Sequence, residues 1–327
     1  TTTPELIWYG IRQLAVVPAQ GGPPQLLTRK LDRNVSDPRF APDGKSIYFI
    51  WEDSGEQRLA RIPSGGGEVT RVIDGRHVVS AFVLSKEGTP VALVSEPANP
   101  GEIFVFEQGK LRRLTKTNDA VMAQIRLGEV EKIRFKSADG TDVEGFLCRP
   151  PSFTPELKYP TLLRIHGGPT AQFSFEFNFE AQLFAANGYL VVMVNPRGSS
   201  GYGQDFSKAI FADWGNKDYE DVMAGVDHAI AKGNADPDRL GVGGWSYGGI
   251  LTNYVISKTT RFKGAISGAG GILWAASYGH DHYQRDYILE LGEPWKNRQA
   301  WDRVSSAFYN VDKITTPTLI MGGEVDW

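Results

Sequence analysis

Cysteine is nearly absent from this sequence of 327 residues, which contains only Cys148. A single cysteine excludes an intramolecular disulfide and a metal site built from cysteine ligands, and a buried apolar role is expected for it. No apolar run reaches the ~18 residues of a membrane-spanning helix. The net charge is −3, and lysine and arginine form no dense run apart from a short cluster at 110–113. These absences argue against a membrane protein and against a nucleic-acid-binding protein.

The first ten residues lack the basic start and the apolar stretch of a signal peptide, which leaves the cellular compartment open. The composition, with 41% hydrophobic and 22% charged residues, is typical of a globular protein with an ample core. A chain of this length exceeds one average domain. We therefore expect two domains.

A repeat occupies the N-terminal third of the sequence. Residues 38–73 and 79–115 are full units, residues 14–28 are a partial one, and the unit ends are 45 and 42 residues apart. Each full unit holds short alternating apolar segments separated by turns such as Pro42-Asp43-Gly44. Such a period indicates β-propeller blades, with a β-sandwich as the alternative. About two and a half blades cannot close a ring, so residues 1–120 are predicted to form an incomplete propeller, truncated at its N-terminal side.

From residue 121 onward, apolar strand-like runs alternate with helical periods. This alternation predicts an α/β-hydrolase domain over 121–327, with a mostly parallel, doubly wound sheet covered on both sides. Asp139-Gly140 is a hairpin signal between two further strands. The expected strands are 161–165, 189–194, 240–243, 262–266 and 317–321, and the expected helices include 179–186 and 218–232.

A strand, the motif Gly244-Trp245-Ser246-Tyr247-Gly248 and a helix follow one another in the sequence. This is the context of a nucleophile elbow, in which the serine occupies a turn so tight that glycine is needed on both sides. The five-residue pattern alone also occurs in ordinary turns. In its strand–helix context we predict that Ser246 is a catalytic nucleophile.

An acyl-transferring serine needs two N–H donors directed at the developing oxyanion. In this fold class, one donor is the residue after the nucleophile, here Tyr247, and the other lies in a glycine-rich loop after an early strand. His166-Gly167-Gly168-Pro169 occupies that position. Because His166 precedes the serine and belongs to this loop, we interpret it as a residue that orders the loop rather than as the general base.

Asp326 is predicted to be the triad carboxylate, because it follows what we expect to be a buried strand and lies downstream of the elbow. Glu324 is the competing carboxylate. No histidine follows Asp326, since the sequence ends at Trp327. His280 and His282 lie between the two triad residues, and we interpret them as surface or pocket-lining residues rather than as metal ligands, so no metal or other cofactor is expected.

Three motifs in this order resemble those of the prolyl oligopeptidase family of serine peptidases: HGGP at 166–169, NPRGSSGYG at Asn195–Gly203 and GWSYGG at Gly244–Gly249. The resemblance extends through essentially the whole chain, propeller included. HGGP is similar to the acylaminoacyl-peptidase branch, and GWSYGG is similar to the dipeptidyl-peptidase branch. Dipeptidyl peptidase IV-type members carry an oxyanion tyrosine where this sequence has His166, so the resemblance implies only a backbone donor, at Gly168.

The final segment GGEVDW is similar to the family's HGExDxRVP segment, with Gly322 in place of its histidine, which supports Asp326. The family's catalytic histidine lies some tens of residues further on, so the resemblance implies truncation at the C-terminal side as well. It also implies that Trp274 and Tyr283 wall the S1 pocket and that substrates are short peptides, with the propeller limiting access. The paired glutamates that anchor a substrate's amino terminus in dipeptidyl peptidases belong to propeller sequence that is not present here.

The sequence thus predicts a serine peptidase that acts through an acyl-enzyme at Ser246. The 327-residue chain alone is predicted to be inactive or nearly so, because one triad member is missing. Two other classes stay open: a carboxylesterase-like hydrolase and a catalytically silent binding protein. The choice between exopeptidase and oligopeptidase, the P1 preference and the oligomeric state, including a homo-oligomer, are also left open.

Overall fold

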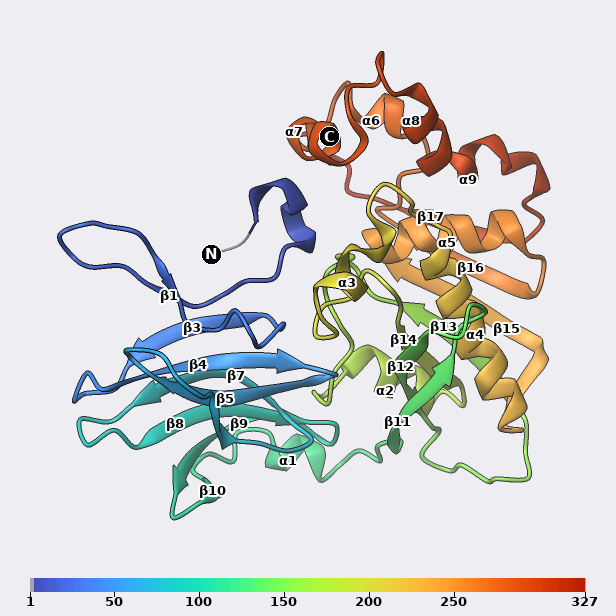
Figure 1. The fold of residues 1–327 in the computed structure, drawn as a ribbon. Coiled ribbons are helices and arrows are strands. Elements are labelled where there is room, and N and C mark those ends of the chain that lie inside the picture. Colours follow the sequence, from blue (N-terminus) through green and yellow to red (C-terminus); the bar gives the residue numbers. More distant parts are fainter. Residues whose placement is uncertain (1–2, 327) are drawn as a thin grey trace.

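The computed structural model describes residues 3–326, which contain two large β-sheets side by side (Figure 1). The first sheet and the segments around it come from the N-terminal third of the chain. The elements of this part are η1 (Pro4–Tyr9), β1 (Ala15–Val16), β2 (Gln25–Leu26), β3 (Val35–Phe40), β4 (Ser46–Asp53), β5 (Glu56–Pro63), β6 (Thr70–Ile73), β7 (Val78–Leu84), β8 (Pro90–Glu96), β9 (Asn99–Glu107), β10 (Lys110–Arg113) and α1 (Asp119–Met122).

The first sheet consists of two consecutive antiparallel units of four strands. Strands β3 to β6 pair in sequence order, β7 to β10 do the same, and a single parallel pair, Gln57 with Val78, joins the units. Their cores contain buried residues such as Phe49, Leu59 and Phe82. Four short strands per unit agree with the sequence repeat. Closure of such units into a propeller and the domain boundary near residue 120 stay predictions.

The second sheet and its helices come from the rest of the chain. Their elements are β11 (Val130–Lys136), β12 (Asp142–Cys148), β13 (Tyr159–Ile165), α2 (Phe179–Ala186), β14 (Leu190–Asn195), α3 (Gln204–Ser207), η2 (Lys208–Ile210), α4 (Lys217–Ala231), β15 (Ala235–Trp245), α5 (Tyr247–Lys258), β16 (Phe262–Gly268), α6 (Trp274–Ser277), α7 (Gln284–Leu291), α8 (Arg298–Val304), α9 (Ser306–Tyr309), η3 (Val311–Lys313) and β17 (Thr318–Met321).

The strand order of this sheet is β11-β12-β14-β13-β15-β16-β17. The five strands from β14 to β17 in this order are parallel, whereas β11 and β12 form an antiparallel hairpin that pairs with β14. The sheet is therefore mixed. Parallel strands need crossover connections, and here α2, α4 and α5 supply them.

The sequence of strand β14 is a continuous apolar run because both faces of the strand are buried. Val192 and Val194 face the large core beneath α4 and α5, while Val191 and Met193 face a smaller core beneath α2. Cys148 is fully buried in the smaller core, as the sequence predicted, and burial raises the pKa of its thiol to about 12. Helices therefore lie on both faces of the sheet at its centre.

Two expectations fail at the far edge of this sheet. The sheet was expected to be covered on both faces, but a hollow of about 790 Å³ lies over β13, β15, β16 and β17. The strand at 317–321 was expected to be buried, but Leu319 and Ile320 of β17 are 56% and 78% exposed. The apolar sequence of this strand predicted an interior position, whereas three of its four residues are exposed in the described structure.

The helix η1 packs against the second part of the molecule although it precedes the first sheet in sequence. Tyr9 is 1% exposed and belongs to the core of the second sheet, with Leu6 and Trp8 packed against it. Figure 1 shows this segment reaching toward α7. The N-terminal segment therefore contributes side chains to the region around Ser246.

Candidate active site

Ser246 occupies the single residue between the end of β15 and the start of α5. Its φ angle is +57°, a sparsely populated conformation for a residue with a side chain, and its N–H donates to the carbonyl of Gly268 at 2.9 Å. Ser246 is exposed. Strained, solvent-facing placement of the serine between strand and helix is the geometry of a nucleophile elbow.

The glycines of the elbow allow α5 to start against the neighbouring strands. A Cβ atom on Gly244 would lie 2.5 Å from the carbonyl oxygen of Ile165, and one on Gly248 would overlap the same oxygen. A Cβ atom on Gly249 would overlap the carbonyl oxygen of Gly268. Close backbone approach, rather than turn geometry alone, therefore accounts for the glycines around Ser246.

The two predicted oxyanion donors, Tyr247 and Gly168, both line the pocket that contains Ser246. Tyr247 is the first residue of α5, where the N–H groups have no partner within the helix. Gly168, with φ of +124°, lies in the same pocket as Ser246. A Cβ atom on Gly167 would lie 3.5 Å from Cβ of Ser246, so the loop after β13 abuts the serine.

His166 forms hydrogen bonds within the loop and with the loop at 195–203. Its Nδ1 lies 2.7 Å from the carbonyl oxygen of Gly167, and its Nε2 lies 3.0 Å from Oγ of Ser199. Since a carbonyl oxygen only accepts, Nδ1 carries the proton and Nε2 accepts from the serine hydroxyl. Burial lowers the pKa of His166 to about 4, which keeps the ring neutral at pH 7. Both ring nitrogens are thus engaged away from Ser246.

Asp326 lies beyond β17 and lines the pocket that contains Ser246, whereas the competing Glu324 does not. The backbone N–H of Asp326 donates to the carbonyl of Gly323 at 3.3 Å, which closes a turn after the strand. Both Ser246 and Asp326 follow the carboxyl ends of parallel strands, β15 and β17. This is the edge of an α/β sheet at which ligands bind.

The pocket has a volume of about 470 Å³ and a largely aromatic wall. Trp274 and Tyr283, which the family resemblance implied as S1 residues, both line it. Three further aromatic residues line it that the sequence did not indicate, namely Trp8, Trp214 and Tyr287. Trp8 comes from η1, and no local pattern links it to the elbow.

Two carboxyl groups are buried next to this wall. Asp218 accepts from the Tyr247 hydroxyl at 2.7 Å, and burial raises its pKa to about 6. Glu290 Oε1 accepts from the Tyr9 hydroxyl at 3.0 Å and from Trp214 Nε1 at 2.7 Å, and burial raises its pKa to about 7. The Asp218 hydrogen bond joins α4 to the first residue of α5, and the Glu290 hydrogen bond to Tyr9 joins α7 to η1.

His282 lines the pocket and packs on the Tyr283 ring with centroids 4.1 Å apart. Among residues 3–326, no hydrogen bond joins a histidine to the Ser246 hydroxyl, and no cluster of His, Cys, Asp or Glu side chains could hold a metal ion. No helix in the same described range is long and apolar enough to cross a bilayer. The structure thus brings Ser246, Tyr247, Gly168, Asp326, Trp274 and Tyr283 to one pocket.

The sequence matches known peptidases. Residues 175–327 match the model of the prolyl oligopeptidase family. The chain is 36% identical to the uncharacterized peptidase YuxL of Bacillus subtilis over 88% of this chain and 44% of the relative. It is 27% identical to dipeptidyl-peptidase 5 of Porphyromonas gingivalis over 90% of this chain and 44% of the relative. The chain therefore spans less than half the length of these two relatives.

The fold matches solved peptidase structures. The uncomplexed acylaminoacyl peptidase of Pyrococcus horikoshii superposes with a TM-score of 0.84 at 27% identity, over 95% of this chain and 49% of that structure. Dipeptidyl peptidase 4 of Porphyromonas gingivalis, at 20% identity and a TM-score of 0.80, shares the fold. The sequence and structure comparisons thus agree with the sequence motifs and with the strand–serine–helix geometry at Ser246. The chain belongs to the prolyl oligopeptidase family of serine peptidases, and its second sheet is that of an α/β-hydrolase domain.

Proposed function

We propose that this protein hydrolyses short peptides through an acyl-enzyme formed on Ser246. The observation that supports the proposal most is the strained, exposed Ser246 at the start of α5, in one pocket with Gly168 and Asp326. Oγ of Ser246 would attack the scissile carbonyl carbon, and the N–H groups of Tyr247 and Gly168 would stabilise the oxyanion. The amine product then leaves with a proton, and water releases the acyl group and restores the serine.

A histidine must take the serine proton and pass it to the leaving amine, with Asp326 holding the ring. His166 is neutral and faces Ser199, and His282 has no hydrogen bond to Ser246 or Asp326 in the described structure. We therefore propose that the 327-residue chain alone hydrolyses peptides slowly or not at all. The remaining rate is what the oxyanion donors and substrate binding supply.

The four-stranded units of the first sheet are proposed to belong to a propeller that limits access to large substrates. The division into a propeller domain up to residue 120 and a hydrolase domain after it is part of the same proposal. The wall of Trp8, Trp214 and Trp274 favours an apolar P1 side chain, because an apolar group gains free energy when it leaves water. A solved acylaminoacyl peptidase, 27% identical to this chain, is in complex with Z-Gly-Gly-Phe-chloromethyl ketone, which supports a phenylalanyl test substrate.

The test compares the 327-residue chain with the longest polypeptide that its gene encodes. Each is assayed on nitroanilides of short peptides with phenylalanine or aspartate at P1, and on nitrophenyl esters. We expect the longer polypeptide to hydrolyse the phenylalanyl anilide, and Ser246→Ala to lower kcat by at least about 10⁴-fold. Hydrolysis of esters without anilides would favour the esterase. Absence of both activities in the longest polypeptide would favour the silent binding protein.

A further inference from the structure

The turn between β4 and β5 reaches from the first sheet to the loops beside Ser246. It is a two-residue hairpin turn in which Ser54 and Gly55 both have positive φ, +51° and +77°, between the paired residues Asp53 and Glu56. Gly55 is buried, and a Cβ atom there would lie 2.7 Å from Cζ of Phe146. The turn therefore needs glycine at 55 twice, for its backbone angle and for its contact with β12.

Every backbone polar group of the two central turn residues is bonded to the second part of the molecule. Ser54 N–H donates to the carbonyl of Gly201 at 3.0 Å, and Ser54 carbonyl accepts from Lys132 Nζ at 2.7 Å. Gly55 N–H donates to Gln172 Oε1 at 2.9 Å, and Gly55 carbonyl accepts from Phe175 N–H at 2.8 Å. The turn thus binds two loops at once.

Gln172 and Phe175 belong to the loop that begins at His166 and contains the predicted oxyanion donor Gly168. The fully buried Asn195 holds the same loop from the other side, since its Oδ1 accepts from Phe173 N–H at 2.7 Å and its Nδ2 donates to Phe173 carbonyl at 2.9 Å. The N–H of Ser200 also donates to the carbonyl of Ala171 at 3.0 Å. The loop at 195–203 and the β4–β5 turn therefore fix residues 171–175 between them.

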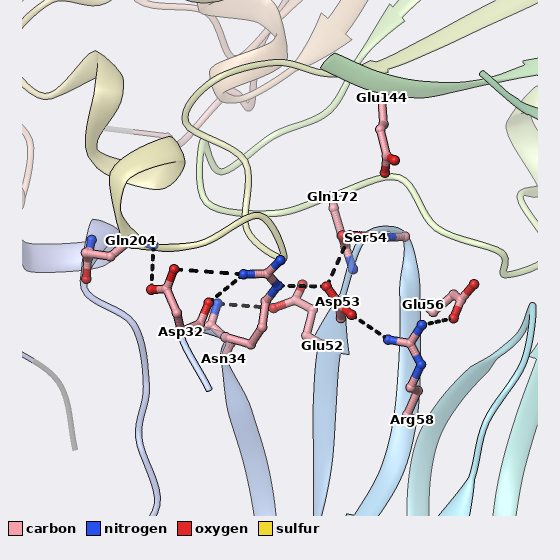
Figure 2. A network of polar contacts seen from close by, with 12 residues as sticks. Asp32, Asn34, Glu52, Asp53, Ser54, Glu56, Arg58, Glu144, Gln172 and Gln204 are labelled. Carbon is pink, nitrogen blue, oxygen red and sulfur yellow. Dashed lines mark hydrogen bonds and ion pairs between the residues drawn. The ribbon is translucent and has the colours of Figure 1, made fainter. Parts of the chain in front are cut away.

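The turn is itself held in place by charged side chains of the first sheet, which Figure 2 shows. The Asp53 carboxylate accepts from Arg33 Nε at 2.7 Å and from Arg58 Nη1 at 2.9 Å. Arg58 also pairs with Glu56, two residues earlier on the same strand, β5. Glu52, which precedes Asp53 in β4, accepts a hydrogen bond from the Ser200 hydroxyl at 2.7 Å. These contacts restrain the turn, so it can in turn restrain the loop that it contacts.

We propose that the β4–β5 turn positions the oxyanion loop, with Gly55 and Gln172 as the positioning pair. The first sheet then takes part in catalysis by placing Gly168 N–H, in addition to any role in limiting access. The expected effect on kcat rests on the proposed function. The expected effect on the structure of the loop does not depend on any activity. Neither Gly55 nor Gln172 lines the pocket that contains Ser246.

The variants are chosen to separate positioning from turn strain. Gln172→Met keeps the length of the side chain and removes the acceptor, and Gln172→Glu keeps an acceptor oxygen. Gly55→Ala disturbs the turn directly. Gly109→Ala is the matched control, since Gln108 and Gly109 form the same kind of turn between β9 and β10, with φ of +53° and +76°, and a Cβ atom on Gly109 contacts nothing within 4 Å.

The first readout is amide hydrogen exchange in the 327-residue chain. We expect Gly55→Ala and Gln172→Met to speed exchange about tenfold or more at residues 171–175, with little change in Gln172→Glu and Gly109→Ala. Equal exchange at 171–175 in Gln172→Met and in the wild type would overturn the proposal. This outcome does not depend on whether the chain is a peptidase.

The second readout is steady-state kinetics on the longest polypeptide that the gene encodes. A misplaced oxyanion donor weakens an interaction made in the transition state, so Gln172→Met should lower kcat roughly ten- to hundredfold with KM nearly unchanged. Gln172→Glu should restore most of kcat. A change confined to KM would overturn the positioning role. If the unmodified polypeptide hydrolyses no peptide, the proposed function fails, and the exchange result alone decides on positioning.

Discussion

At the scale of single residues, burial raises the pKa of two carboxyl groups next to the Ser246 pocket, Asp218 and Glu290. Glu290 is 5% exposed, and its Oε1 accepts from Tyr9, Trp214 and the backbone N–H of Ala212, yet burial still raises its pKa from 4.5 to about 7. Desolvation of the carboxylate therefore outweighs three hydrogen bonds that favour the charged form. Nothing in the sequence around Glu290 indicated this, because its partners lie 76 or more residues away.

The raised pKa of Glu290 predicts how stability depends on pH. The folded chain holds a proton that the unfolded chain releases near pH 4.5, so this group stabilises the fold below that pH and loses its contribution as the pH rises through about 7. Between about pH 5 and about pH 8, the loss is on the order of 2 kcal/mol.

Glu290→Gln keeps an acceptor oxygen for the three donors and cannot ionise. We expect the free energy of unfolding, measured by urea titration at several pH values, to fall less in this variant than in the wild type as the pH rises. Asp218, whose pKa burial raises to about 6, contributes in the same direction in both proteins and so cancels in the comparison. Identical slopes for the two proteins would contradict the prediction.

At the scale of elements, the junction of β15 and α5 depends on backbone contacts that only glycine permits. Gly248→Ala would place a methyl group on the carbonyl oxygen of Ile165, so α5 would have to move away from β13. Overpacking of this kind costs about 1–3 kcal/mol.

Gly264→Ala is the control for this prediction, because Gly264 lies in the adjacent strand β16 and a Cβ atom there contacts nothing within 4 Å. Denaturant unfolding should show a clear loss of stability for Gly248→Ala and a change within about 0.5 kcal/mol for Gly264→Ala. Equal stabilities of the two variants would show that the elbow tolerates a side chain at 248.

The bounds of individual helices were the feature of the fold that the sequence predicted most closely. The helix expected at 179–186 is α2 with the same bounds, and the helix expected at 218–232 is α4 within one residue at each end. For α4, the periodicity of the sequence showed which face is apolar, and this was enough to place the helix. It could not show that β17 is exposed, because exposure depends on what packs beside a strand.

At the scale of the whole molecule, the hollow over β13, β15, β16 and β17 leaves apolar side chains in contact with water. Leu319 and Ile266, which line it, are 56% and 42% exposed. An exposed apolar patch of this kind binds hydrophobic dyes and favours association. We therefore expect the 327-residue chain to enhance the fluorescence of the dye ANS.

Leu319→Lys should lower this dye fluorescence, because the lysine ammonium group would lie in the hollow. Ile125→Lys is the matched control, since Ile125 is 45% exposed and lies in the connection between α1 and β11, outside the hollow. Equal dye binding by both variants would indicate that ANS binds elsewhere on the chain.

The sequence by itself determined the family, the α/β alternation, the strand–serine–helix elbow and the candidate residues of the pocket. These features are local or follow chain order, so spacing and motif reveal them. Only the tertiary structure brought Trp8 to the Ser246 pocket, Tyr9 to the buried Glu290 and Gly55 to the loop after β13. Such contacts join residues more than 100 positions apart, and packing and hydrogen bonding, rather than any repeat in the sequence, select them.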